Sequence, residues 1–93
     1  MALYSLNLGE FRVVTEPGSI ISTVLGSCVA VCLHDAAAQV GGMNHFMLPK
    51  PQGAGASAQA EMQCYGVHAM ELLINEMMHR GAMRPRLRAH LYG

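Results

Sequence analysis

Charged residues are scarce in this chain: Asp, Glu, Lys and Arg make up 13% of its 93 residues, and the formal net charge is zero. The long-range field that draws proteins to nucleic acids or anionic lipids is therefore missing from the chain as a whole. Hydrophobic residues reach 52%, far from the composition of a disordered segment. We expect one globular domain, because so short a chain leaves no room for a second.

Signals for export and membrane insertion are also lacking. The chain opens without the basic and apolar regions of a secretory signal. The uncharged run 17–33 is short for a membrane span and contains several polar residues and glycines, so we interpret it as buried strands. Three cysteines, an odd number, then favour reduced thiols over a disulfide framework. We expect a cytoplasmic protein.

Several strands are predicted before any helix. Residues 10–15, 19–25 and 29–33 are rich in β-branched and apolar residues, and a turn is expected at 16–18. The apolar run 40–48 follows a tight connection in which the Asp35 side chain can bond to the local backbone. The last two segments therefore predict a β-hairpin.

The second half of the chain predicts one helix and one strand. Apolar residues recur at spacings of three and four between Val67 and Met78, and Gly81 follows as a C-terminal signal, so we expect a helix over about 57–80. After Pro85, apolar and charged residues alternate, which predicts a half-exposed strand. We interpret the arginines of this region as a solvated strand face rather than an anion site; they are Arg80, Arg84, Arg86 and Arg88.

Cys28 is the best candidate for a nucleophile. Gly26 and Ser27 precede it and are too small to wall off the thiol, and backbone N–H groups at such a strand entry could hold an oxyanion. If the hairpin turns between Ala36 and Ala37, Cys28 lies directly opposite His45, with their Cβ atoms roughly 5 Å apart. His45 could then be the base of a Cys-His dyad.

Other interpretations of these residues remain open. A one-residue slip of register would put the two side chains on opposite faces, and a buried structural cysteine with a hydrogen-bonded core histidine is the plain alternative. Ser22 and Thr23 carry hydroxyls that could orient the imidazole or a substrate amide, although most such hydroxyls bond to backbone. Cys32 is expected in the core, and no compact ligand spacing supports a metal site.

Two longer motifs surround these residues: Thr-Val-Leu-Gly-Ser-Cys-Val-Ala-Val-Cys at 23–32 and Gly-Gly-Met-Asn-His-Phe-Met-Leu-Pro at 41–49. Together they resemble the CheD family of chemoreceptor glutamine deamidases. The resemblance implies that Cys28 is the nucleophile and His45 its base. The family also uses a threonine six residues before the cysteine, a place that Ser22 holds here, with Thr23 as the alternative.

Further consequences follow from the resemblance. It implies an α+β fold, an α/β sandwich of mostly antiparallel strands with a helix packed on one face, as in other cysteine hydrolases. Gly26, Ser27 and Asn44 are then candidates for the oxyanion and substrate contacts. Relatives typically continue past the position of Gly93 with further strands, so residues 1–93 are expected to form a single CheD-like domain that lacks them.

The implied activity is hydrolysis of receptor glutamine side chains to glutamate through a cysteine thioester, with release of ammonia and no cofactor or metal. The implied partners are chemoreceptors, with no role for nucleic acid or membrane insertion. The alternative is a binding module that docks on a CheC-type phosphatase and stimulates it without catalysis. A thiol redox sensor at Cys28 is a weaker third possibility.

Overall fold

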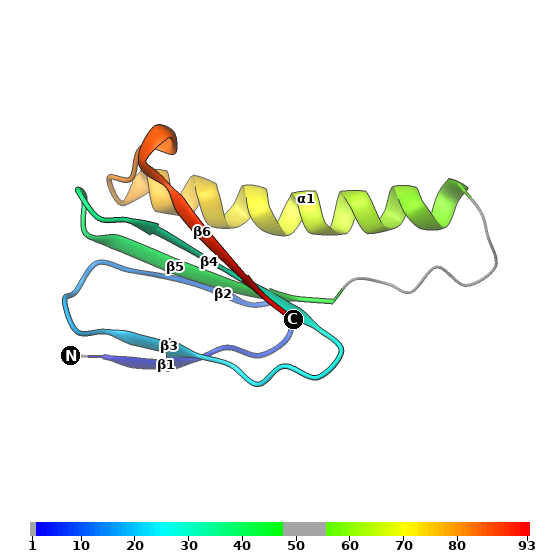
Figure 1. Cartoon of the computed structure of the whole chain (residues 1–93), viewed down its shortest axis with the longest axis horizontal. Coiled ribbons are helices and arrows are strands. Elements are labelled where there is room, and N and C mark those ends of the chain that lie inside the picture. Colours follow the sequence, from blue (N-terminus) through cyan, green and yellow to red (C-terminus); the bar gives the residue numbers. More distant parts are fainter. Residues whose placement is uncertain (1, 48–55) are drawn as a thin grey trace.

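The chain folds into three layers in a computed structural model, which describes residues 2–47 and 56–93 and only the backbone of 56–65. Helix α1 (Ala56–His79) covers one face of a four-stranded sheet, and a small two-stranded sheet lies on the other face (Figure 1). This arrangement confirms the predicted α+β class with a helix on one face of a mostly antiparallel sheet.

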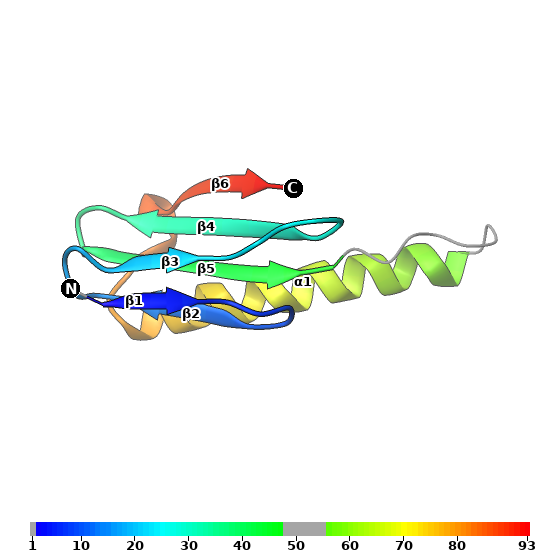
Figure 2. The same cartoon turned by 90° about the horizontal axis from the view of Figure 1, so that it is seen from below.

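The larger sheet is antiparallel throughout and has the strand order β2-β5-β4-β6. The smaller sheet pairs β1 with β3 in parallel and lies on the β2 and β5 side, away from β6 (Figure 2). The strand bounds are β1 Leu3–Ser5, β2 Phe11–Val14, β3 Ile20–Ser22, β4 Val29–Asp35, β5 Val40–Phe46 and β6 Arg88–Tyr92.

Two apolar clusters hold the layers together. Between α1 and the sheet, Leu73 and Met77 are fully buried against β4 and β5. Gly42 makes this close contact possible, because a Cβ atom there would lie 2.8 Å from Sδ of Met77 and 2.9 Å from Cδ1 of Leu73. The second cluster, formed by Leu6, Ala30 and Met43, lies between the two sheets.

The predicted strands are present, but β2, β3 and β5 are shorter than expected and β4 extends two residues further, to Asp35. The segments 10–15 and 19–25 contribute only β2 and β3, and β1 was not predicted. The hairpin of β4 and β5 is confirmed, as is the turn at 16–18, where the Ser19 N–H donates to the Glu16 carbonyl at 3.3 Å and Gly18 has a φ of 81°.

Helix α1 ends as its sequence predicts. The N–H of Ala82 donates to the Met77 carbonyl at 3.0 Å and that of Gly81 to the Met78 carbonyl at 3.1 Å. This pair of bonds is a Schellman motif, and it requires the positive φ of 107° that Gly81 adopts. No helix in the described ranges 2–47 and 56–93 is long and apolar enough to cross a membrane.

The predictions for the last strand and for the C-terminal arginines were only partly correct. All five residues of β6 are exposed, so this edge strand is not half-buried as expected. Arg86 lies before it, in the short 3₁₀ turn Arg84–Arg86, and forms an ion pair with Asp35 instead of facing solvent alone. Arg80 lies 3.6 Å from Glu76 on the surface of α1, a contact expected to contribute little to stability.

Asp35 ties the end of the hairpin to the chain that follows the helix. Its side chain is fully buried, and its oxygens accept the N–H of Ala38 at 3.0 Å, the N–H of Met83 at 2.9 Å and Nε of Arg86 at 3.0 and 3.1 Å. Burial alone would raise the pKa of Asp35, but the two backbone donors and Arg86 outweigh it and lower the pKa to about 2. The hydrogen bond from the Ala38 N–H confirms the predicted bond between the Asp35 side chain and its local backbone.

Candidate active site

The predicted pairing of Cys28 with His45 is wrong by two residues. In the β4–β5 ladder, Ala30 lies opposite His45 and Asp35 lies opposite Val40. The connection is the four-residue turn 36–39, in which Gln39 takes a φ of 57°, so the hairpin turns one position later than expected. A shift of two keeps the same face, whereas a shift of one would reverse it.

Cys28 therefore lies diagonally from His45 instead of opposite it. It immediately precedes β4 and is half-buried. Diagonal neighbours on one face of an antiparallel pair are about 7 to 8 Å apart, with their Cβ atoms somewhat closer. Cys28 belongs to the loop at the strand entry, outside the β4–β5 ladder.

The His45 side chain is held on one edge by Thr23. The residue is 7% exposed, and its Nδ1 lies 2.8 Å from Oγ1 of Thr23. The Thr23 hydroxyl donates its only hydrogen to the Leu6 carbonyl, at 2.9 Å. With that hydrogen on the Leu6 carbonyl, Oγ1 accepts from Nδ1–H, and this pattern favours the neutral tautomer that carries its proton on Nδ1.

The other ring nitrogen is the one that could act as a base. Nε2 of His45 is buried and has no hydrogen-bond partner among the residues that the structure describes. Buried polar atoms are rarely left in this state. With the proton fixed on Nδ1, Nε2 presents a lone pair, as the general base of a thiol nucleophile must.

Thr23 rather than Ser22 makes the contact with His45. Oγ of Ser22 is 3.5 Å from the Tyr4 carbonyl, in an exposed position. Strand β3 ends at Ser22, so Thr23 lies just outside it. The alternation of side chains within a strand therefore does not determine the direction of the Thr23 side chain. The preference for Ser22, which rested on counting six residues back from Cys28, is not supported by this geometry.

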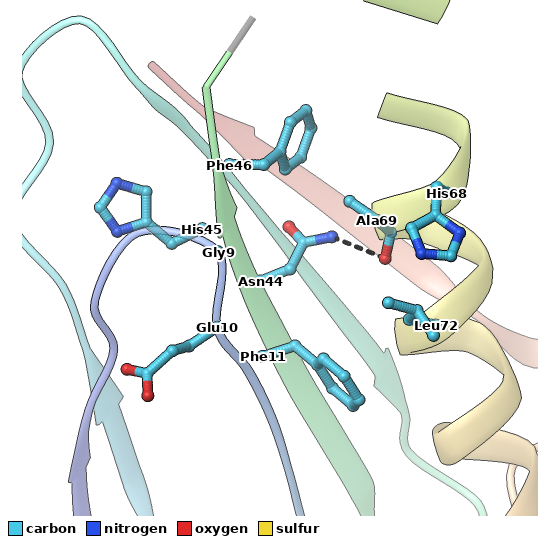
Figure 3. A pocket seen from close by; sticks show the side chains of 9 residues that line it. All are labelled: Gly9, Glu10, Phe11, Asn44, His45, Phe46, His68, Ala69 and Leu72. Carbon is cyan, nitrogen blue, oxygen red and sulfur yellow. Dashed lines mark hydrogen bonds between the residues drawn. The ribbon is translucent and has the colours of Figure 1, made fainter. Parts of the chain in front are cut away.

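Asn44 lies on the opposite face of the sheet from the imidazole. It is 2% exposed, its Oδ1 accepts the N–H of Val31 at 3.0 Å, and its Nδ2 donates to the Ala69 carbonyl at 3.4 Å (Figure 3). Strand alternation could have indicated this, because adjacent residues point to opposite faces. Asn44 links the sheet to α1 and does not share a side with the imidazole.

One cavity is lined in part by His45, and a separate depression lies on the face of the sheet that carries its imidazole. On the helix side, a cavity of about 250 Å³ includes Phe11, Phe46 and Leu72, but the imidazole points away from them (Figure 3). On the imidazole side, an open depression of about 420 Å³ is lined by Thr23 and Ala30, among others, but by neither His45 nor Cys28. Gly26 and Ser27 are exposed, and the space around Gly26 is empty.

The remaining thiols and histidines do not gather into a second site. Burial raises the pKa of the Cys32 thiol, which is half-buried and packs against the cluster of Leu6, Ala30 and Met43 instead of lying within the core as expected. The side chain of Cys64 lies outside the described residues. Within the described part of the chain, no group of three His, Cys, Asp or Glu side chains could hold a metal ion.

A family model now decides the affiliation. The model described as CheD chemotactic sensory transduction matches residues 47–93, half of the chain. The chain belongs to the CheD family. The region that the family model matches begins after Cys28 and His45. The evidence for those two residues therefore comes from similarity to individual CheD proteins.

Three curated relatives carry the description "Probable chemoreceptor glutamine deamidase CheD". The chain is 54% identical to the one from Rhizobium meliloti (strain 1021), and 53% identical to those from Sinorhizobium medicae (strain WSM419) and Zymomonas mobilis subsp. mobilis (strain ATCC 31821 / ZM4 / CP4). Each match covers 85 residues, 91% of this chain and 46% of the relative. The chain thus spans about half the length of the curated relatives it matches, and so long a match must include Cys28 and His45.

Proposed function

We propose that the chain carries the nucleophile and base of a protein-glutamine deamidase that converts chemoreceptor glutamines to glutamate. Membership of the CheD family supports the reaction and the substrate, which are those in the names of its relatives. The observation that carries the assignment of residues is the contact of Thr23 with His45, because it leaves Nε2 free to accept a proton.

In the first half of the reaction, Nε2 of His45 takes the proton of the Cys28 thiol. The thiolate attacks the carboxamide carbon of the glutamine side chain, and backbone N–H groups near Gly26 and Ser27 stabilise the oxyanion. The C–N bond breaks while the imidazolium gives its proton to the departing ammonia. A thioester of Cys28 remains.

In the second half, water attacks the thioester carbon as His45 removes its proton. The C–S bond breaks, glutamate is released and the proton returns to the Cys28 sulfur. The substrate would approach from the imidazole side of the sheet, the face that also carries Thr23 and Ala30. The reaction needs no cofactor, and reduced cysteines suit a cytoplasmic setting.

Replacement of the thiol tests this proposal. Cys28→Ala should abolish conversion of a receptor fragment, followed by intact-protein mass and by ammonia release. Cys32→Ala is the matched control, because it removes a half-buried thiol from the same segment and should leave turnover measurable. Full deamidation by the Cys28→Ala protein would rule out the mechanism.

The alternative function is docking on a CheC-type phosphatase without catalysis. It predicts that neither the wild-type chain nor the Cys28→Ala variant releases ammonia, and that both bind the phosphatase equally. The free Nε2 of His45 favours the catalytic proposal, since docking alone has no need of a buried base.

A further inference from the structure

The peptide unit between Leu6 and Asn7 is hydrogen-bonded at both ends. Its carbonyl, from Leu6, accepts the hydroxyl of Thr23 at 2.9 Å. Its N–H, from Asn7, donates to Oε1 of Glu10 at 2.6 Å. One rigid peptide plane therefore lies between the Glu10 carboxylate and the hydroxyl that contacts His45.

The turn that contains Glu10 also binds the backbone of His45. The Glu10 N–H donates to the Asn7 carbonyl at 3.1 Å and closes the turn, in which Gly9 has a φ of 85°. The Gly9 N–H donates to the His45 carbonyl at 2.8 Å, and the His45 N–H donates to the Glu10 carbonyl at 3.0 Å. The same turn thus fixes the backbone of His45 and the acceptor that orients its ring.

We propose that Glu10 is a positioning residue for His45, acting through the Leu6–Asn7 peptide and the Thr23 hydroxyl. The chain of bonds runs from the carboxylate to Asn7 N–H, from Leu6 carbonyl to Thr23 Oγ1–H, and from Thr23 Oγ1 to His45 Nδ1–H. No covalent bond changes along it.

Each bond in this chain polarises the next. A carboxylate that accepts the Asn7 N–H makes the Leu6 carbonyl a stronger acceptor, and the Thr23 hydroxyl in turn becomes a better acceptor for Nδ1–H. The result is a fixed ring orientation and a fixed tautomer. In other hydrolases, a carboxylate bonded directly to the histidine has this role. Glu10 would fulfil it across one peptide and one hydroxyl.

The first test reads the tautomer and needs no activity. ¹⁵N-histidine NMR of the full chain, with His45→Asn to assign the signal, should show neutral His45 protonated on Nδ1. Glu10→Ala should raise the population with the proton on Nε2 by roughly three- to tenfold, the effect of losing about one hydrogen bond. Glu10→Gln keeps an oxygen that accepts Asn7 N–H and should retain the Nδ1–H form.

The second test rests on the proposed deamidation. Glu10→Ala should lower kcat by roughly three- to tenfold with KM unchanged, and Glu10→Gln should restore most of kcat. Glu71→Ala is the matched control, because it removes an exposed carboxylate that belongs to α1 rather than to this turn. Melting curves of all variants check that they are folded, which the exposed position of Glu10 favours.

The outcomes separate the two proposals. A wild-type chain that releases no ammonia but shows the Nδ1–H tautomer, lost in Glu10→Ala and kept in Glu10→Gln, overturns the deamidase and leaves the positioning role intact. If the alanine and glutamine variants behave alike, whether both resemble wild type or both are impaired, the positioning role of Glu10 is overturned.

Discussion

Oγ1 of Thr23 lies 2.8 Å from Nδ1 of His45, on the edge of the ring away from the nitrogen that would accept the thiol proton. When its hydrogen is donated to the Leu6 carbonyl, the hydroxyl acts as the acceptor at this contact. Thr23 then favours one tautomer of a buried imidazole. The family's threonine position falls on Ser22 by counting, but the hydroxyl that meets the ring belongs to the next residue.

Substitutions of Thr23 should distinguish the effect of its hydroxyl group from the effect of its side-chain volume. Thr23→Val keeps the volume and loses the acceptor, so kcat for ammonia release should fall between about 10- and 100-fold. Thr23→Ser keeps the hydroxyl and should lose far less. Ser22→Ala is the comparison at the neighbouring position, and a larger loss there than in Thr23→Val would reverse the assignment.

The Asp35 cluster should make stability depend on acid pH. The folded pKa of Asp35 is about 2, below its ordinary 3.8, so its stabilising effect is present above pH 3.8 and disappears as the pH falls towards 2. Urea midpoints should therefore be lower for Asp35→Asn than for wild type at neutral pH, and the difference should shrink between about pH 4 and pH 2. Glu71→Gln, an exposed carboxylate on α1, should follow wild type across the range; a constant gap for Asp35→Asn would contradict the ionised cluster.

The Cys32 thiol should react slowly with alkylating reagents. Burial raises its pKa, so less thiolate is present at neutral pH than in an unfolded chain. A variant with Cys28→Ser and Cys64→Ser, which leaves only Cys32, should react with iodoacetamide more slowly when folded than in denaturant at pH 7. Mass spectrometry over time gives both rates, and equal rates would show that the sheet does not shield this sulfur.

Two adjacent glycines should respond differently to alanine. At Gly42 the new methyl would meet Met77 and Leu73 at under 3 Å, so Gly42→Ala should cost about 1 to 3 kcal/mol of unfolding free energy through overpacking. At Gly41 the nearest atoms lie 3.8 Å away, which is ordinary contact, so Gly41→Ala is the matched control. Chemical denaturation of both variants measures the difference; equal effects would mean that α1 moves freely off β5.

Local patterns predicted the elements well. The periodicity of apolar residues and the glycine after Arg80 predicted α1 and its end to within a residue, because both depend on neighbours in the chain. The β4–β5 hairpin was likewise evident. Strand β1 was missed because three residues give too short a pattern, and its partner β3 is distant in sequence.

The site was harder to predict, because it depends on register and on backbone groups. The turn after Asp35 consists largely of alanines, which do not specify where a hairpin reverses; the positive φ of Gln39 is visible only in the structure. The acceptor for Thr23 is the main-chain carbonyl of Leu6, and any residue type can provide one. Side-chain identities indicated Cys28 and His45 as candidates and Thr23 as one of two possible orienting hydroxyls, whereas the Leu6 carbonyl had no signal in the sequence.

The contacts of Asp35 also bear on the order of events in folding. One of its hydrogen bonds reaches a residue three positions away, but the others join it to residues 48 and 51 positions further along the chain. A loop of that length must close, at a cost in chain entropy, before those bonds can form. We therefore expect the hairpin and α1 to form early and the contacts of Asp35 to form late. Removal of these contacts should then mainly raise the rate of unfolding.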